Sequence, residues 1–188
     1  MVEEITQANL ILTNSLDKEI LAQSKKGSQV IFFAEKGDGV KNKAHYSFRQ
    51  LDIGESWARA SSMNYVDTAW FEGLPIQPEM GWEFDRLIPD YVIPFKDYKK
   101  VGKKQTVNMF GNPLLSENVD ITSGYFEGWL GQNGGSVIKQ DMGEGSILTV
   151  TWKLVSQIEH NPIALLILNR HIEIMCGKHK VSSSKSVR

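Results

Sequence analysis

Residues 123–154 read SGYFEGWLGQNGGSVIKQDMGEGSILTVTWKL, and residues 161–175 read NPIALLILNRHIEIM. The first segment holds two runs of strand-forming residues separated by Asp141–Gly145, where two glycines permit the positive φ angles of a tight hairpin. The second segment has the composition of a helix that begins with Asn-Pro. A strand, a glycine-rich turn, a strand and a capped helix are typical of the end of a doubly wound α/β sheet.

The two strands are expected over Val137–Gln140 and Ser146–Leu154. Side chains of a strand alternate between its two faces. Leu148, Val150 and Trp152 therefore share one face, and the threonines and the lysine between and after them share the other. This alternation predicts a strand that packs on a core through its apolar face.

The helix is expected from Pro162 to about Cys176, because Asn161 is a favourable N-cap and proline is favoured at the first helical position. Beyond it, residues 181–188 (VSSSKSVR) are expected to be disordered. No internal repeat or linker is visible before them. Residues 1–180 are therefore expected to form a single domain.

The N-terminal region predicts a parallel pair of strands joined by a helix. Asn9–Thr13 and Gln29–Ala34 are short apolar runs, and the residues between them form an amphipathic helix that Asn14 or Ser15 would cap and Gly27 would end. A strand, a short helix and a second strand form a right-handed crossover with parallel strands. The fold is therefore expected to be α/β, with a mostly parallel sheet between helix layers and a C-terminal hairpin and helix.

Composition excludes several classes of function. The chain has 188 residues, 41% of them hydrophobic and 23% charged, which suffices for a core without disulfides or metals. A net charge of −1 gives no electrostatic footprint for nucleic acid or an anionic membrane. The longest apolar run, Ile163–Leu168, is far shorter than the roughly 20 residues of a membrane span. No signal peptide is visible, but a domain from a secreted parent would also lack one, so the compartment stays open.

Residues for nucleophilic or metal chemistry are scattered. No G-x-S-x-G or G-x-C-x-G elbow is present, and the lone Cys176 follows a helix, where a packing role is expected. The four histidines show no paired ligand spacing: His45, His160, His171 and His179. No metal and no cofactor is therefore expected.

The best candidate for a binding surface is Trp82-Glu83-Phe84-Asp85, in which aromatic and acidic residues alternate. In a strand the two acids would share one face and the two aromatic rings the other. Carboxylates and aromatic platforms both bind sugars, although a half-buried strand has the same alternation. Carbohydrate-binding candidates are therefore Trp82, Glu83, Asp85, Trp70 and Trp129, with simple packing as the alternative for each.

Five segments together resemble a known family. They are FEGLP at 71–75, GWEFDRLIPDYVIPF at 81–95, GYFEGWLG at 124–131, GEGSILTVTWKL at 143–154 and HNPIALLILNRHI at 160–172. The combination is similar to an auxiliary domain of bacterial glycoside hydrolase family 2 enzymes, the β-galactosidase-like group. In those proteins a flavodoxin-like module, similar to class I glutamine amidotransferases, lies C-terminal to the catalytic barrel.

The resemblance implies a flavodoxin-like, three-layer α/β fold without catalytic residues of its own. The hydrolase glutamates of that family lie on a (β/α)₈ barrel of about 250 residues, and no position here matches their motifs. The Cys elbow of the amidotransferases is also absent from the sequence. The implied function is a non-catalytic auxiliary or carbohydrate-recognition module whose partner, in cis or in trans, is the catalytic barrel of a sugar hydrolase.

Two alternatives remain open from the sequence. One is a stand-alone small-molecule enzyme of amidotransferase-like fold, with its ligand at the carboxyl ends of the strands, near Asn14 and Glu35. The other is a structural oligomerisation domain with a large apolar interface.

Overall fold

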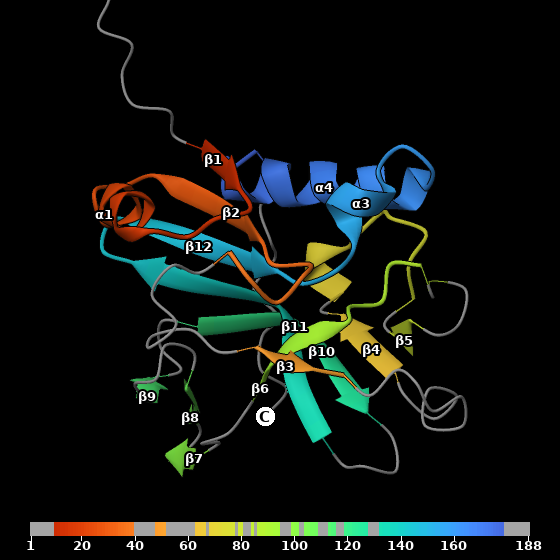
Figure 1. Cartoon of the computed structure of the whole chain (residues 1–188), viewed down its shortest axis with the longest axis horizontal. Coiled ribbons are helices and arrows are strands. Elements are labelled where there is room, and N and C mark those ends of the chain that lie inside the picture. Colours follow the sequence, from red (N-terminus) through yellow and green to blue (C-terminus); the bar gives the residue numbers. More distant parts are fainter. Residues whose placement is uncertain are drawn as a thin grey trace, which may run out of the picture.

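The computed structural model shows a mixed α/β fold in which a large sheet has helices on both faces (Figure 1). It describes residues 10–39, 48–51, 63–66, 68–77, 79–80, 84, 86–94, 99–101, 104–108, 113–115, 119–127 and 132–178.

The large sheet has nine described strands. Seven follow one another in the order β1 (Leu10–Thr13), β2 (Gln29–Phe33), β12 (Gly145–Val150), β11 (Gln132–Met142), β10 (Val119–Glu127), β4 (Met63–Val66) and β5 (Glu79–Met80). The other two are β6 (Tyr91–Pro94), which pairs with β11, and β3 (Arg49–Gln50), which pairs with β6. A separate three-stranded sheet contains β7 (Lys99–Val101), β8 (Lys104–Asn108) and β9 (Pro113–Leu115). The described helices are α1 (Lys18–Lys25), the 3-10 helix η1 (Thr68–Trp70), α3 (Leu154–Gln157) and α4 (Pro162–Met175).

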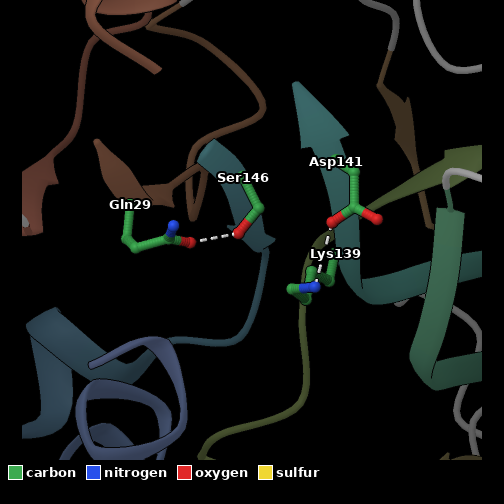
Figure 2. A network of polar contacts seen from close by, with 4 residues as sticks. All are labelled: Gln29, Lys139, Asp141 and Ser146. Carbon is green, nitrogen blue, oxygen red and sulfur yellow. Dashed lines mark hydrogen bonds and ion pairs between the residues drawn. The ribbon is translucent and has the colours of Figure 1, made fainter. Parts of the chain in front are cut away.

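The predicted N-terminal crossover is confirmed. Strands β1 and β2 pair in parallel with Leu10 opposite Gln29, and α1 connects them. Strand β12 joins the other side of β2, also in parallel, with Ser146 opposite Gln29. In Figure 2 the Ser146 hydroxyl donates a hydrogen bond to Oε1 of Gln29, which ties these two strands at their amino ends.

The rest of the large sheet is antiparallel, so the sheet is mixed and the predicted parallel order holds only for β1, β2 and β12. Strands β11 and β12 follow each other through a two-residue turn, and such a connection permits only antiparallel pairing. Strand β10 precedes β11 by a short connection and pairs with it in the same way.

The predicted hairpin is confirmed, with different strand ends. Met142 faces Gly145 across the turn, and Gly143 has a φ of 64° there. Strand β11 is longer than expected, because the sheet continues through Gly134 and Gly135, which pair with β6. Strand β12 ends at Val150 rather than at Leu154, since Leu154 already begins α3.

Helix α4 begins as predicted, and α1 begins later than predicted. The side chain of Asn161 accepts a hydrogen bond from the Ile163 N–H at 3.0 Å. The N-cap of α1 is Asp17, not Asn14 or Ser15, and its carboxylate accepts hydrogen bonds from two N–H groups of the first turn. Its negative charge also suits the positive end of the helix dipole.

A hydrophobic core is packed on each face of the sheet. On one face, Val30, Phe32 and Ile147 pack with Ile20 and Leu21 of α1. On the other face, a larger cluster joins the sheet to α4 and to the residues around η1; it includes Ile31, Leu148, Val150, Trp152, Ala164, Ile167 and Met175. Because both faces are covered, Thr149 and Thr151 are also fully buried on the face predicted to be polar.

Candidate functional site

A cavity of about 730 Å³ opens at the carboxyl ends of the parallel strands β1 and β2. The residues around it belong to the end of β1, the end of β2 with the loop after it, and the start of α3. These elements are labelled in Figure 1. The lining residues are Leu12, Thr13, Asn14, Phe33, Glu35, Lys36, Asp38, Gly39, Val155 and Ser156. In open α/β sheets, ligands bind outside the carboxyl ends of the strands, so this cavity is the candidate functional site.

The loop after β2 is held against the end of β1. Its backbone turns back on itself through a hydrogen bond from the Gly37 N–H to the Ala34 carbonyl at 3.0 Å. The Gly39 carbonyl then accepts from the Leu16 N–H at 2.7 Å. At Gly39, with a φ of 84°, a Cβ would lie 2.1 Å from the carbonyl oxygen of Asn14. Glycine is therefore required for this close approach, and the loop forms a fixed wall.

Glu35 joins the other two parts of the wall. Its Oε1 accepts a hydrogen bond from the Val155 N–H at 2.5 Å, and Oε2 accepts from the Ser156 N–H at 3.3 Å. The carboxylate thereby satisfies backbone donors at the start of α3, which lack partners within the helix. These bonds hold the Glu35 carboxylate against the start of α3, so Glu35 fixes this side of the cavity.

The remaining lining combines polar groups with apolar surface. Asn14, Lys36 and Asp38 are exposed and offer an amide, an ammonium group and a carboxylate. Leu12 and Val155 are 50% and 49% exposed, and they are the two most exposed large hydrophobic residues in the described part of the chain. The arrangement suits a small molecule with hydrogen-bonding groups on one side and an apolar face on the other.

The carbohydrate-binding candidates from the sequence lie elsewhere. Trp70 is 5% exposed within the larger core, where its ring lies edge-on to His171 with 6.2 Å between the ring centroids. In this position its ring packs and offers no open platform. The other four candidates, Trp82, Glu83, Asp85 and Trp129, lie outside the described residues.

The other reactive groups in the described part of the chain do not converge on the cavity. Cys176 is exposed after the last turn of α4. His160 is exposed before α4, and His171 is fully buried within it. Among the described residues no three histidine, cysteine or carboxylate side chains lie close enough together to hold a metal ion. Within the same residues no helix is long and apolar enough to cross a membrane.

Sequence reasoning found only part of the cavity. Asn14 and Glu35 were expected from the rule that ligands bind at strand ends. Asp38 lies in a polar glycine-containing loop, which is a usable signal. Nothing in the sequence around Val155 and Ser156 indicates that they line a cavity. They follow Glu35 by 120 and 121 residues, and only the folded sheet brings them close to it.

No protein-family model matches this chain, and no curated protein matches it with statistical significance.

Proposed function

We propose that this chain is a non-catalytic recognition module for a small carbohydrate, and that the sugar binds in the strand-end cavity. The observation that carries this proposal is the lining of the cavity. Asn14, Lys36 and Asp38 supply donors and acceptors for hydroxyl groups, and Leu12 and Val155 supply an apolar surface for the C–H face of a sugar ring.

The groups that line the cavity support a recognition role rather than a catalytic one. Neither histidine nor cysteine is among the residues that the structure shows around the cavity, and the Glu35 carboxylate is bound to the backbone of α3. Sugar cleavage by an acid pair requires two carboxyl groups held on either side of the scissile bond. Asp38 is the one other carboxylate in the described lining.

We further propose that the module belongs to a sugar-hydrolase system of the glycoside hydrolase family 2 type and packs against its catalytic barrel. The support is the sequence resemblance together with the β1–α1–β2 crossover, which a flavodoxin-like fold also contains. Helices on both faces of the sheet agree with this relationship. The antiparallel strands β4, β10 and β11 depart from a flavodoxin-like order and are proposed to be an elaboration of it.

Binding is tested by titrating the ¹⁵N-labelled chain with galactose and with glucose. Addition of the bound sugar is expected to shift the amide resonances of residues 12–14, 35–39 and 155–156. Asp38→Ala should weaken binding about tenfold, because a hydrogen bond to a charged group is lost. The matched control is Asp141→Ala, since Asp141 faces Ser146 at the opposite end of the sheet and should leave affinity unchanged.

Two results would count against the proposal. If both sugars left the cavity resonances unmoved at high millimolar concentration, the carbohydrate assignment would be wrong. If the purified chain hydrolysed an aryl galactoside and Asp38→Asn abolished turnover, the cavity would be the active site of a small-molecule enzyme, which is the alternative that the same strand-end position favours.

A further inference from the structure

His171 of α4 is an ionisable group buried without a polar partner. The residue is 0% exposed, and neither ring nitrogen has a hydrogen-bond partner among the described residues. Its ring lies nearly perpendicular to two aromatic rings, with centroid distances of 6.2 Å to Trp70 and 5.9 Å to Phe71. The imidazole therefore sits at the contact between α4 and residues 68–76, which comprise η1 and the turns after it.

Charged groups around this contact lie at its edge. Arg170 pairs with Glu173 at 3.3 Å along α4, and its Nη1 donates a hydrogen bond to the carbonyl oxygen of Glu72 at 2.5 Å. Glu72 is the one charged residue of the segment 68–76, and its side chain is exposed. Strands β2 and β12 and helix α3, which the structure describes in full, contain no charged residue. Among the described residues, no carboxylate lies beside His171 to stabilise an imidazolium ion.

Residues 68–76 are held by short-range hydrogen bonds, by the bond from Arg170 and by the burial of Trp70 and Phe71, and they border a second cavity. Within the segment, the Leu74 N–H donates to the Phe71 carbonyl and the Ile76 N–H donates to the Leu74 carbonyl. A second cavity, of about 410 Å³, is lined by Val66, Ala69, Phe71, Glu72, Gly73, Leu74 and Ile76. Phe71 contacts His171 through its ring and is also one of the residues around this cavity, so a movement of Phe71 would bring water from the cavity to the imidazole.

We propose that His171 makes the contact between α4 and residues 68–76 acid-sensitive, and that proton uptake favours a form in which Phe71 has moved aside and His171 is hydrated. This device is separate from the strand-end cavity and does not depend on a bound sugar.

The direction of the effect follows from burial. Burial lowers the pKa of His171 from 6.5 to about 3, because the charged form is desolvated in the closed structure. In the open form the ring has an ordinary pKa near 6.5. The closed form is therefore at full stability above pH 6.5 and loses stability as the pH falls toward 3. Between pH 7.5 and pH 5 the ratio of open to closed molecules should rise about thirtyfold.

The test is hydrogen exchange of the amides of residues 68–76 at pH 7.5 and pH 5, corrected for the intrinsic exchange rate. The wild-type chain should show about a thirtyfold increase in opening at pH 5. His171→Phe, which keeps an aromatic ring and cannot take up a proton, should lose this increase. His160→Gln is the matched control, because His160 is exposed, and it should keep the increase.

A direct measurement on the wild-type chain covers the case in which His171→Phe does not fold. The ring resonances of His171 should report a neutral imidazole in the closed form at pH 5. Titration of this ring near pH 6.5 in the closed form would overturn the proposal. So would equal pH dependence in the wild type and His171→Phe, or an acid response spread evenly over β2, β11 and β12.

Discussion

Gly145 shows how closely two segments approach at the hairpin turn. A Cβ on this residue would lie 2.2 Å from the carbonyl oxygen of Ser28 and 2.4 Å from that of Ser24. The Ser24 oxygen belongs to the end of α1 and the Ser28 oxygen to the turn that follows it. The Lys25 carbonyl also accepts from the Glu144 N–H at 3.2 Å. The missing side chain thus allows the end of α1 to pack directly on the β11–β12 turn.

Gly145→Ala is expected to lower the free energy of unfolding by about 3 kcal/mol or more, because the methyl group meets backbone atoms that cannot move without shifting α1. Chemical denaturation measures the change. Gly124→Ala is the control: its Cβ would lie 3.8 Å from the nearest atom, the Gly134 carbonyl oxygen, and the cost should stay below about 1 kcal/mol. Equal losses in the two variants would show that close approach is not the cause.

Buried hydroxyl groups in the middle of the sheet are hydrogen-bonded. The Ser123 and Ser136 hydroxyls lie 2.7 Å apart across β10 and β11, and the Thr151 hydroxyl donates to the Ser136 carbonyl at 3.0 Å. All three residues are buried. Buried polar groups are tolerated when they are paired, so these contacts allow a polar strip in a covered sheet.

Helix α4 depends on its first residues as well as on its packing. Asn161 caps the first turn, Pro162 takes the first helical position, and four apolar residues of the helix are buried: Ala164, Ile167, Leu168 and Met175. The cap is a local interaction, and it fixes where the helix begins. The buried residues then hold α4 on the sheet.

Asn161→Ala should destabilise the protein by about 1 kcal/mol, because the Ile163 N–H loses its acceptor. The change is measured as a lower denaturation midpoint with an unchanged slope. Asn161→Asp keeps an oxygen acceptor and should retain most of the stability. If alanine and aspartate had the same effect, the side-chain cap would not contribute.

The two cores depend on a common sheet. Ile147 packs on the α1 side and Leu148 on the α4 side, although they are neighbours in β12. Strand β12 lies between β2 and β11. A loss of packing on either of its faces therefore destabilises the centre of the sheet. The parts of the chain that contain these elements should therefore unfold together.

Ile147→Ala and Leu148→Ala should each lower the free energy of unfolding by about 3 kcal/mol, since both remove fully buried side chains. Far-ultraviolet circular dichroism and tryptophan fluorescence should give coincident transitions in both variants. Leu165→Ala, on the exposed side of α4, removes the same kind of side chain and should cost less than about 1 kcal/mol. Transitions that separated in one variant would show that the two cores unfold independently.

Local patterns predicted the elements that local interactions stabilise. The β11–β12 hairpin, the helix after Asn161 and the crossover from β1 to β2 were all read from turn residues, caps and alternation. The cap of α1 was placed too early, because Leu16 still bonds to the Gly39 carbonyl before the helix starts. That bond joins residues 23 positions apart, and a local pattern does not contain it.

The amino-acid order alone was sufficient for an α/β class, for the hairpin and for the helix capped by Asn161. The hairpin turn and the helix cap each depend on residues within about four positions of one another. The strand order, the antiparallel part of the sheet and the complete lining of the cavity became known only from the folded structure. The hydrogen bond from Val155 to Glu35 joins segments that are distant in the chain. So does the burial of His171 against Trp70 and Phe71. Such contacts form when the apolar faces of distant segments are buried against the same sheet. Which segments meet is therefore decided by the packing of the whole molecule.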